Sequence, residues 1–154
     1  MEQTMNTTVM RQTNRRRVYQ YIYKSAQPVT KQEIAGDLSL SLPTVSGNLT
    51  ELLEEGLVSC SGTQESTGGR KPQTYVLNPR ARVAVGMCLL DDGAQLLAID
   101  MRGEELGCRE LPIPFAHTPE YYQEIARHLE DFIDSCGLDR KRLLGVGIAI
   151  PGII

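Results

Sequence analysis

Apolar positions recur with a helical period along the first part of the chain. Val9, Val18 and Ile22, with the tyrosines between them, fit a predicted helix over about residues 8–25. A short second helix is predicted after Pro28, and its inward stripe consists of Ile34, Ala35 and Leu38. The first part of the chain is therefore predicted to be mainly helical.

Capping residues predict where the second and third helices begin and end. Thr30 and Glu33 have the capping-box spacing, in which each side chain satisfies a backbone N–H of the other residue. Ser41 is a candidate N-cap for a third helix, with Pro43 in the first turn, where a missing N–H costs nothing. Gly56 is expected to close that helix as its C′ residue.

The predicted third helix has an apolar side and a polar side. Val45, Leu49 and Leu52 recur at helical spacing and are expected to face the core. The opposite side consists of Pro43, Thr44, Gly47, Asn48 and Glu51. Two helices, a tight turn and a polar N-terminal face are typical of a helix-turn-helix, in which Thr can meet a thymine methyl and Asn can pair with adenine. The alternative is a three-helix bundle with a solvated face.

Residues 57–62 and 73–77 have strand-like patterns and predict a hairpin, with Val58 and Cys60 turned inward. The loop between them ends in Gly68-Gly69-Arg70-Lys71-Pro72. Glycines allow close backbone approach, and an adjacent arginine suits insertion into a narrow, electronegative minor groove. This hairpin is typical of the wing of a winged helix; the alternative is an ordinary basic loop.

Charge is distributed unevenly along the chain. Residues 1–80 hold nine Lys and Arg against seven Asp and Glu, whereas residues 81–154 hold seven against twelve. Arg11, Arg15, Arg16 and Arg17 are clustered in the first half. The asymmetry favours an anionic partner for that half, with Arg15, Arg16 and Arg17 neutralising phosphates. The alternative is a set of solvated surface arginines.

The ordered combination of residues in the first half resembles the N-terminal domain of ROK-family transcriptional regulators, which include repressors of xylose and N-acetylglucosamine utilisation genes. The resemblance covers most of residues 10–80. The residues that carry it are Asn14-Arg15, Val18, Ile22, Val29-Thr30, Glu33-Ile34-Ala35, Leu40-Ser41-Leu42-Pro43-Thr44-Val45-Ser46, Leu49, Leu52, Gly56-Leu57-Val58, Gly68-Gly69-Arg70-Lys71-Pro72 and Leu77-Asn78.

The second half is predicted to have the order β-β-β-α-β. The strands cover residues 83–89, 95–101, 104–111 and 144–150, with a turn at Asp91-Asp92-Gly93 and a helix that begins after Thr118. This order is similar to the first part of a ribonuclease-H-like lobe, as in actin and sugar kinases. A partial lobe of this kind would leave one side of its sheet uncovered.

The phosphate-binding hairpin of ROK sugar kinases carries Asp-x-Gly-x-Thr, and the corresponding residues here are Cys88, Leu90 and Asp92. Cys cannot anchor the metal and phosphate network, Leu lacks the conformational freedom of Gly, and Asp would repel phosphate. The resemblance therefore implies a regulator and not an enzyme. The enzyme alternative is a ROK sugar kinase with an added N-terminal domain, and a third class is a protein-interaction module.

Apolar runs and cysteine spacing indicate where the protein is located and whether this chain binds a cofactor. The chain of 154 residues has no apolar run of about 18 residues and no apolar stretch near its start that could serve as a signal peptide, so we expect a cytoplasmic protein. Its four cysteines form no C-x-x-C pair and are expected to be reduced. We expect no cofactor in this chain; in the family, the sugar contacts and a structural zinc site lie further on. The chain is interpreted as a fragment, the alternative being a short form whose partial lobe dimerises.

These observations predict an α+β protein in two domains. Residues 1–80 are expected to form a winged helix-turn-helix, and residues 81–154 a partial actin-like (ribonuclease-H-like) lobe at the start of a ROK domain. The predicted function is sequence-specific repression of sugar-utilisation genes by a homodimer that binds an A·T-flanked inverted repeat in double-stranded DNA, without membrane association. In the complete protein a sugar would be the effector. The predicted DNA-binding residues are Arg15, Arg16, Arg17, Thr30, Ser41, Pro43, Thr44, Ser46, Asn48, Arg70 and Lys71.

Overall fold

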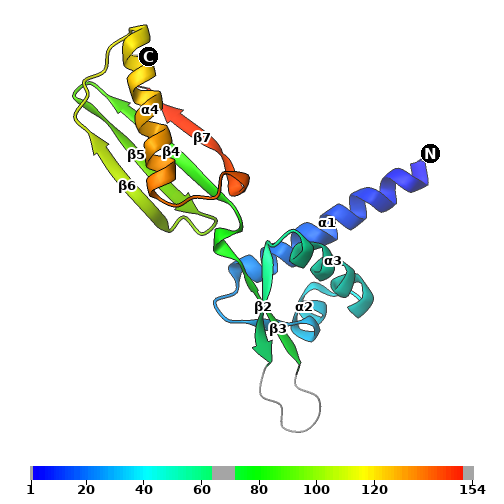
Figure 1. The fold of residues 1–154 in the computed structure, drawn as a ribbon. Helices are drawn as coiled ribbons and strands as arrows, with labels where there is room; N and C mark the ends of the chain where they lie inside the picture. Colours follow the sequence, from blue (N-terminus) through cyan, green and yellow to red (C-terminus); the bar gives the residue numbers. More distant parts are fainter. Residues whose placement is uncertain (1, 64–71, 151–154) are drawn as a thin grey trace. The chain divides into compact units, whose positions relative to one another are not determined.

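A computed structural model describes residues 2–63 and 72–150 of the chain. The chain divides into two compact units, Met1–Asn78 and Pro79–Ile154, each with its own helices and sheet (Figure 1). Helices and strands are both well represented, so the predicted α+β class is confirmed at this level.

The first unit contains helices and a small antiparallel sheet. Its elements are α1 (Glu2–Lys24), β1 (Val29–Thr30), α2 (Lys31–Leu38), α3 (Leu42–Glu54), β2 (Val58–Thr63) and β3 (Gln73–Leu77). The strand order is β1-β3-β2, so β2 is an edge strand. The predicted three helices and hairpin are confirmed in this order.

The ends of α2 and α3 follow from the predicted caps. The Oγ1 of Thr30 accepts from the backbone N–H of Glu33 at 3.3 Å, and the Glu33 carboxylate accepts from the N–H of Thr30 at 2.6 Å. Ser41 caps α3, Pro43 lies in its first turn, and Gly56 follows its last residues at φ 70°. These local interactions confirm the predicted positions of both helices.

The core of the first unit is an apolar seam between the helices and the sheet. Its most buried residues are Val18, Ile22, Ile34, Val45, Leu49, Leu52, Val58 and Tyr75. The outward parts of α3 are therefore fixed by the burial of its Val45–Leu49–Leu52 stripe.

One predicted inward position, Cys60, is wrong, and Val9 of α1 faces solvent. Val9 is 58% exposed because it lies about 180° around the helix axis from the buried Val18. Cys60 is exposed, because it lies on the edge strand next to a register shift between Cys60 and Gly62.

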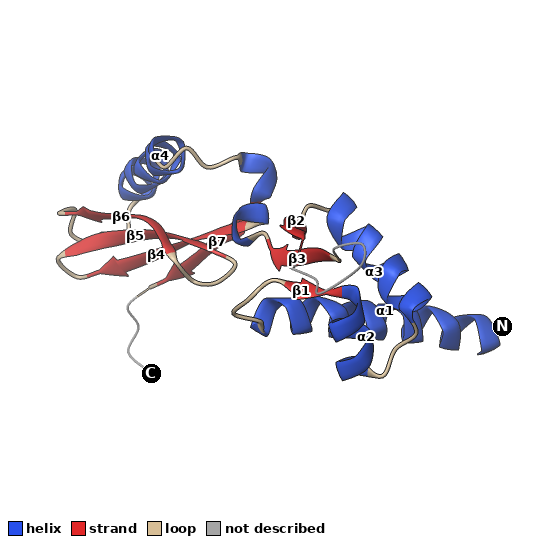
Figure 2. Ribbon diagram, turned by 90° about the horizontal axis from the view of Figure 1, so that it is seen from below, coloured by secondary structure: helices blue, strands red, loops and turns tan. Residues whose placement is uncertain are grey.

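The second unit is a four-stranded sheet with one long helix on one face (Figure 2). Its elements are η1 (Pro79–Ala81), β4 (Val83–Leu90), β5 (Gly93–Asp100), β6 (Glu105–Leu111), α4 (Pro119–Ser135), η2 (Arg140–Arg142) and β7 (Leu143–Ala149). The strand order is β6-β5-β4-β7, with only β4 and β7 parallel among these pairs. The predicted β-β-β-α-β order is confirmed.

The helix α4 and the sheet bury one core between them. Alternate residues of β4 and β5 point into this core, where they meet Tyr121, Ile125, Phe132 and Ile133 of α4. On the other face, Ala84, Gly86, Leu97 and Leu144 line a shallow hollow. No described element of the unit covers that hollow.

The β4–β5 hairpin brings a glycine close to the backbone of β6. A Cβ atom at Gly93 would lie 2.7 Å from the carbonyl oxygen of Leu111, which is too short for a non-bonded contact. The opposite residue across the hairpin is Leu90, and the next residue, Ala94, pairs with Leu111 of β6, so the position of Gly93 is held from both sides. The β6 backbone therefore leaves no room for a side chain at Gly93.

We expect Gly93→Ala to lower the free energy of unfolding by about 1–3 kcal/mol, because the β6 backbone must move to admit the methyl group. Urea unfolding followed by circular dichroism measures the change. Gly86→Ala is the matched control, since its Cβ would lie 3.9 Å from the carbonyl of Leu97, an ordinary contact. Equal stability of the two variants would contradict the steric argument.

Candidate nucleic-acid interface

The first turns of α3 present a small, uncharged surface. Ser41, Leu42, Pro43 and Gly47 are exposed, and the first turn contains no acidic residue. The Ser41 hydroxyl accepts from the backbone N–H of Thr44 at 3.3 Å and lies 2.8 Å from the Thr44 hydroxyl. A polyanion can approach such a helix end without meeting a carboxylate.

The polar side predicted for α3 borders a groove between α3 and α1. All five of its residues, Pro43, Thr44, Gly47, Asn48 and Glu51, line this groove of about 430 Å³ together with Met10, Arg11 and Asn14 of α1. Asn48 is only 5% exposed, and its Nδ2 donates to the carbonyl of Thr44 at 2.7 Å. Its predicted contact with adenine stays a prediction, and this amide would first have to leave its present hydrogen bond.

The solvent side of α3 includes a residue that the sequence analysis missed. Thr50 is exposed, lies one turn after Gly47, and donates through Oγ1 to the carbonyl of Ser46 at 3.0 Å. Ser46 itself is half-buried. The spacing of Pro43, Gly47 and Thr50 at i, i+4 and i+7 is the signal that could have found this face.

The three consecutive arginines of α1 have different surroundings. Arg15 pairs with Glu55 and lies 3.6 Å from Glu51, and the exposed Arg17 donates to the carbonyl of Leu38 at 2.7 Å. Among the described residues, Arg16 alone of the three has neither a hydrogen-bond nor an ion-pair partner, and its side chain is exposed.

A fourth arginine, Arg11, pairs with Glu51. Its hydrogen bond to that carboxylate raises the pKa of the Arg11 guanidinium above its ordinary value. The sequence analysis did not include Arg11 in the site. The i, i+4 spacing of Arg11 with Arg15, and of Glu51 with Glu55, was the available signal.

The remaining predicted site residues are either buried or lie outside the described residues. Thr30 is 4% exposed and its hydroxyl belongs to the cap of α2. Arg70 and Lys71 lie outside the described residues. Their contacts with DNA stay predictions.

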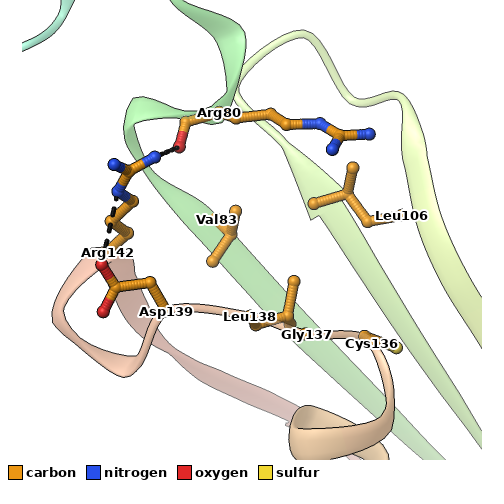
Figure 3. A pocket seen from close by; sticks show the side chains of 8 residues that line it. All are labelled: Arg80, Val83, Leu106, Cys136, Gly137, Leu138, Asp139 and Arg142. Carbon is orange, nitrogen blue, oxygen red and sulfur yellow. Dashed lines mark hydrogen bonds and ion pairs between the residues drawn. The ribbon is translucent and has the colours of Figure 1, made fainter.

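The second unit contains a separate pocket of about 220 Å³ between η2, the end of α4 and the sheet (Figure 3). Its apolar part is formed by Val83, Leu106 and Leu138. At its mouth, Arg142 donates to the carbonyl of Arg80 at 3.3 Å and lies 3.5 Å from Asp139. Within the described ranges there is no group of three or more His, Cys, Asp or Glu that could hold a metal ion.

The chain has relatives among characterised regulators, although no family model matches it. It is 26% identical over 149 residues to the DNA-binding transcriptional dual regulator NagC of Escherichia coli K12, covering 97% of this chain and 36% of the relative. It is 26% identical over 148 residues to the xylose repressor of Bacillus subtilis, covering 96% of this chain and 38% of the relative. The chain thus spans little more than a third of the length of these relatives.

A solved structure described as a ROK-family transcriptional regulator, homolog of the Escherichia coli MLC protein, has the same fold. It superposes with a TM-score of 0.67 over 94% of this chain and 37% of that structure, at 20% identity. The chain is thus similar in sequence to these transcriptional regulators and similar in fold to a ROK-family regulator. In the described part of the chain, no helix is long and apolar enough to cross a membrane.

The positions that correspond to the kinase motif lie around the β4–β5 hairpin. Cys88 is half-buried near the end of β4, Leu90 is 45% exposed, and Asp92 is exposed in the turn. The Asp, Gly and Thr of the kinase motif are thus replaced by Cys88, Leu90 and Asp92. Two further relatives are named as an N-acetylglucosamine repressor and a xylose repressor. The names of these relatives describe regulators of transcription.

A hydrogen bond between α1 and α2 shifts the pKa of a tyrosine. The Tyr21 hydroxyl donates to Asp37 at 2.6 Å. This hydrogen bond, with a smaller effect of burial, raises the pKa of Tyr21 from 10.0 to about 12. Because the pKa is raised in the folded state, the stabilising effect is complete below pH 10 and is lost as the pH rises toward 12.

We expect Asp37→Asn to lower the pKa of Tyr21 toward its ordinary value, and to reduce stability by less than about 1 kcal/mol because the pair is near solvent. Ultraviolet absorbance of the phenolate during a pH titration measures the shift, and Tyr21→Phe identifies the signal. An unchanged titration in Asp37→Asn would contradict the assignment.

Proposed function

We propose that the chain contains the DNA-binding domain and the beginning of the effector domain of a sequence-specific transcriptional repressor. Residues 1–80 are proposed to be a winged helix-turn-helix, with α2 and α3 as its two helices and β2–β3 as its wing. Residues 81–154 are proposed to be the first part of a ROK domain with an actin-like lobe. The resemblance and the named relatives support both assignments.

The observation that carries the proposal is the exposed, uncharged N-terminal surface of α3. Its core stripe is fully buried, so the helix cannot turn this surface away from solvent. A recognition helix contacts base edges through its N-terminal turns, and small side chains let it approach the floor of the major groove.

The proposed roles follow from position and chemistry. Pro43, Thr44 and Ser46 would contact bases, with Asn48 joining them once its amide is released. Ser41 and Thr30, at the starts of α3 and α2, would lie near phosphates. Arg16 and Arg17 would neutralise phosphates, whereas the minor-groove roles of Arg70 and Lys71 rest on the sequence alone.

The proposed partners are an A·T-flanked inverted repeat in double-stranded DNA, a second copy of the chain and, for the complete protein, a sugar. The relatives named as N-acetylglucosamine repressor and xylose repressor support a sugar-responsive regulator. We propose a cytoplasmic location, no cofactor in this chain, and a zinc site, if the protein has one, in the further part of the ROK domain.

We expect in-vitro selection with the purified chain to enrich an inverted repeat from random duplex DNA. Anisotropy across a salt series would then give Arg16→Gln a slope of log K against log salt that is smaller by about one, because one phosphate contact is lost. Lys24→Gln, an exposed cation at the other end of α1, is the control with an unchanged slope. A chain that is dimeric by size exclusion and enriches no sequence would contradict the proposal.

We expect Gly47→Ala to stabilise the chain and weaken its DNA binding. A Cβ at Gly47 meets nothing within 4 Å, so replacing a helical glycine should raise the free energy of unfolding by about 0.5–1 kcal/mol. On the DNA-facing surface the same methyl group should cost about 1–3 kcal/mol of specific binding.

Gly36→Ala in α2 is the matched control for Gly47→Ala. Its Cβ also meets nothing within 4 Å, so it should give the same gain in stability without the loss of binding. If both variants bound the selected DNA as tightly as the parent, Gly47 would not lie at the interface.

A further inference from the structure

We infer that Arg11 and Arg15 are positioning residues that hold α1 along α3 through Glu51 and Glu55, and thereby fix the presentation of the DNA-reading surface. This inference rests on the proposed function, and it replaces the phosphate-binding role predicted for Arg15.

The four side chains form a ladder between two helices. Arg11 and Arg15 are one turn apart on α1, and Glu51 of α3 is one turn before Glu55, the residue that caps the C-terminal end of α3. Arg11 pairs with Glu51, Arg15 pairs with Glu55, and the Nε of Arg15 lies 3.6 Å from the Oε2 of Glu51. Glu51 is therefore shared between two arginines, so the pairs form a network.

The middle of the ladder is shielded from water. The side chains of Arg15 and Glu51 are 31% and 29% exposed, whereas that of Arg11 is 71% exposed. Charge pairs that are partly buried are screened less than fully exposed ones, and networks contribute more than isolated pairs. Arg15, which is partly buried and lies within ion-pair distance of both carboxylates, is accordingly expected to contribute most to the ladder.

The ladder lies where apolar packing between the helices ends. Val18 and Ile22 of α1 are buried in the core, but Met10, about two turns before Val18 and beside the groove, is 61% exposed. Because Met10 is not buried against α3, the ionic contacts orient this part of α1. They also define the groove that Thr44 and Asn48 share with α1.

The same pairs neutralise the carboxylate of Glu51, which lines the groove with Thr44 and Asn48, and that of Glu55 at the C-terminal end of α3. Glu51 and Glu55 would repel phosphates if they were unpaired. In a phosphate-binding role, Arg15 would gain freedom when Glu55 lost its charge, and DNA binding would hold or improve. In a positioning role, removing either partner of a pair has the same effect on sequence discrimination.

The experiment compares Arg15→Gln, Glu51→Gln and Glu55→Gln with Glu54→Gln. Glu54 is exposed on the same helix and has no ion-pair partner in the described part of the chain, so it controls for the change in net charge. The measured quantity is the ratio of affinities for the selected repeat and for random DNA, because this ratio cancels non-specific attraction.

We expect the ratio to fall about two- to fivefold in the three ladder variants and to stay unchanged in Glu54→Gln. The salt slope of Arg15→Gln should equal that of the parent. The reciprocal exchange Arg15→Glu with Glu55→Arg should recover part of the lost ratio. A salt slope smaller by about one in Arg15→Gln, or an unchanged ratio in Glu55→Gln, would overturn the positioning role.

A second measurement needs no DNA. Backbone hydrogen exchange over residues 8–16 should be faster in Glu51→Gln and Glu55→Gln than in the parent, and unchanged in Glu54→Gln. If the parent selects no DNA sequence but exchange responds in this way, the proposed function is contradicted, whereas the positioning of α1 by the ladder is supported. If exchange in all three variants matches the parent, the ladder does not position α1 and the inference fails.

Discussion

The burial of one stripe of α3 is the constraint on which the first unit depends. Val45, Leu49 and Leu52 have essentially no exposed surface, and they pack with the buried positions of α1 and the sheet. A helix with a fixed buried stripe has a fixed outer side as well, because residues follow one another at about 100° around its axis. The exposed surface at Pro43 and Gly47 is thus a consequence of core packing.

The outer side of α3 has two regions with different chemistry. Toward solvent, the helix begins without a charged side chain, which suits close approach to an anionic duplex. Toward α1, Glu51 and Glu55 carry charge, and arginines of α1 compensate it. The arrangement leaves the charge of Glu51 paired where that residue lines the groove with Thr44 and Asn48. Arg16 then becomes the arginine of α1 that is best placed to meet a phosphate.

The second unit has a simpler architecture, in which one face of a mixed sheet is buried under α4. Small residues such as Ala84 and Gly86 alternate with large buried ones along β4, so the two faces of the strand differ in character from the start. The core against α4 closes the unit on one side. The pocket near η2 has an apolar interior and paired charges at its mouth, and it does not bear on the proposed DNA contact.

The sequence by itself determined the features that depend on near neighbours. Capping boxes, proline and glycine at helix ends, and the buried stripe of α3 all arise within a few residues, so the helices and hairpins could be predicted. The tertiary structure alone decided that Cys60 is exposed and that Asn48 turns toward α1. It also decided that Arg15 pairs with Glu51 and Glu55. Those outcomes join residues about 40 positions apart or depend on a neighbouring strand or helix, and no local period encodes them.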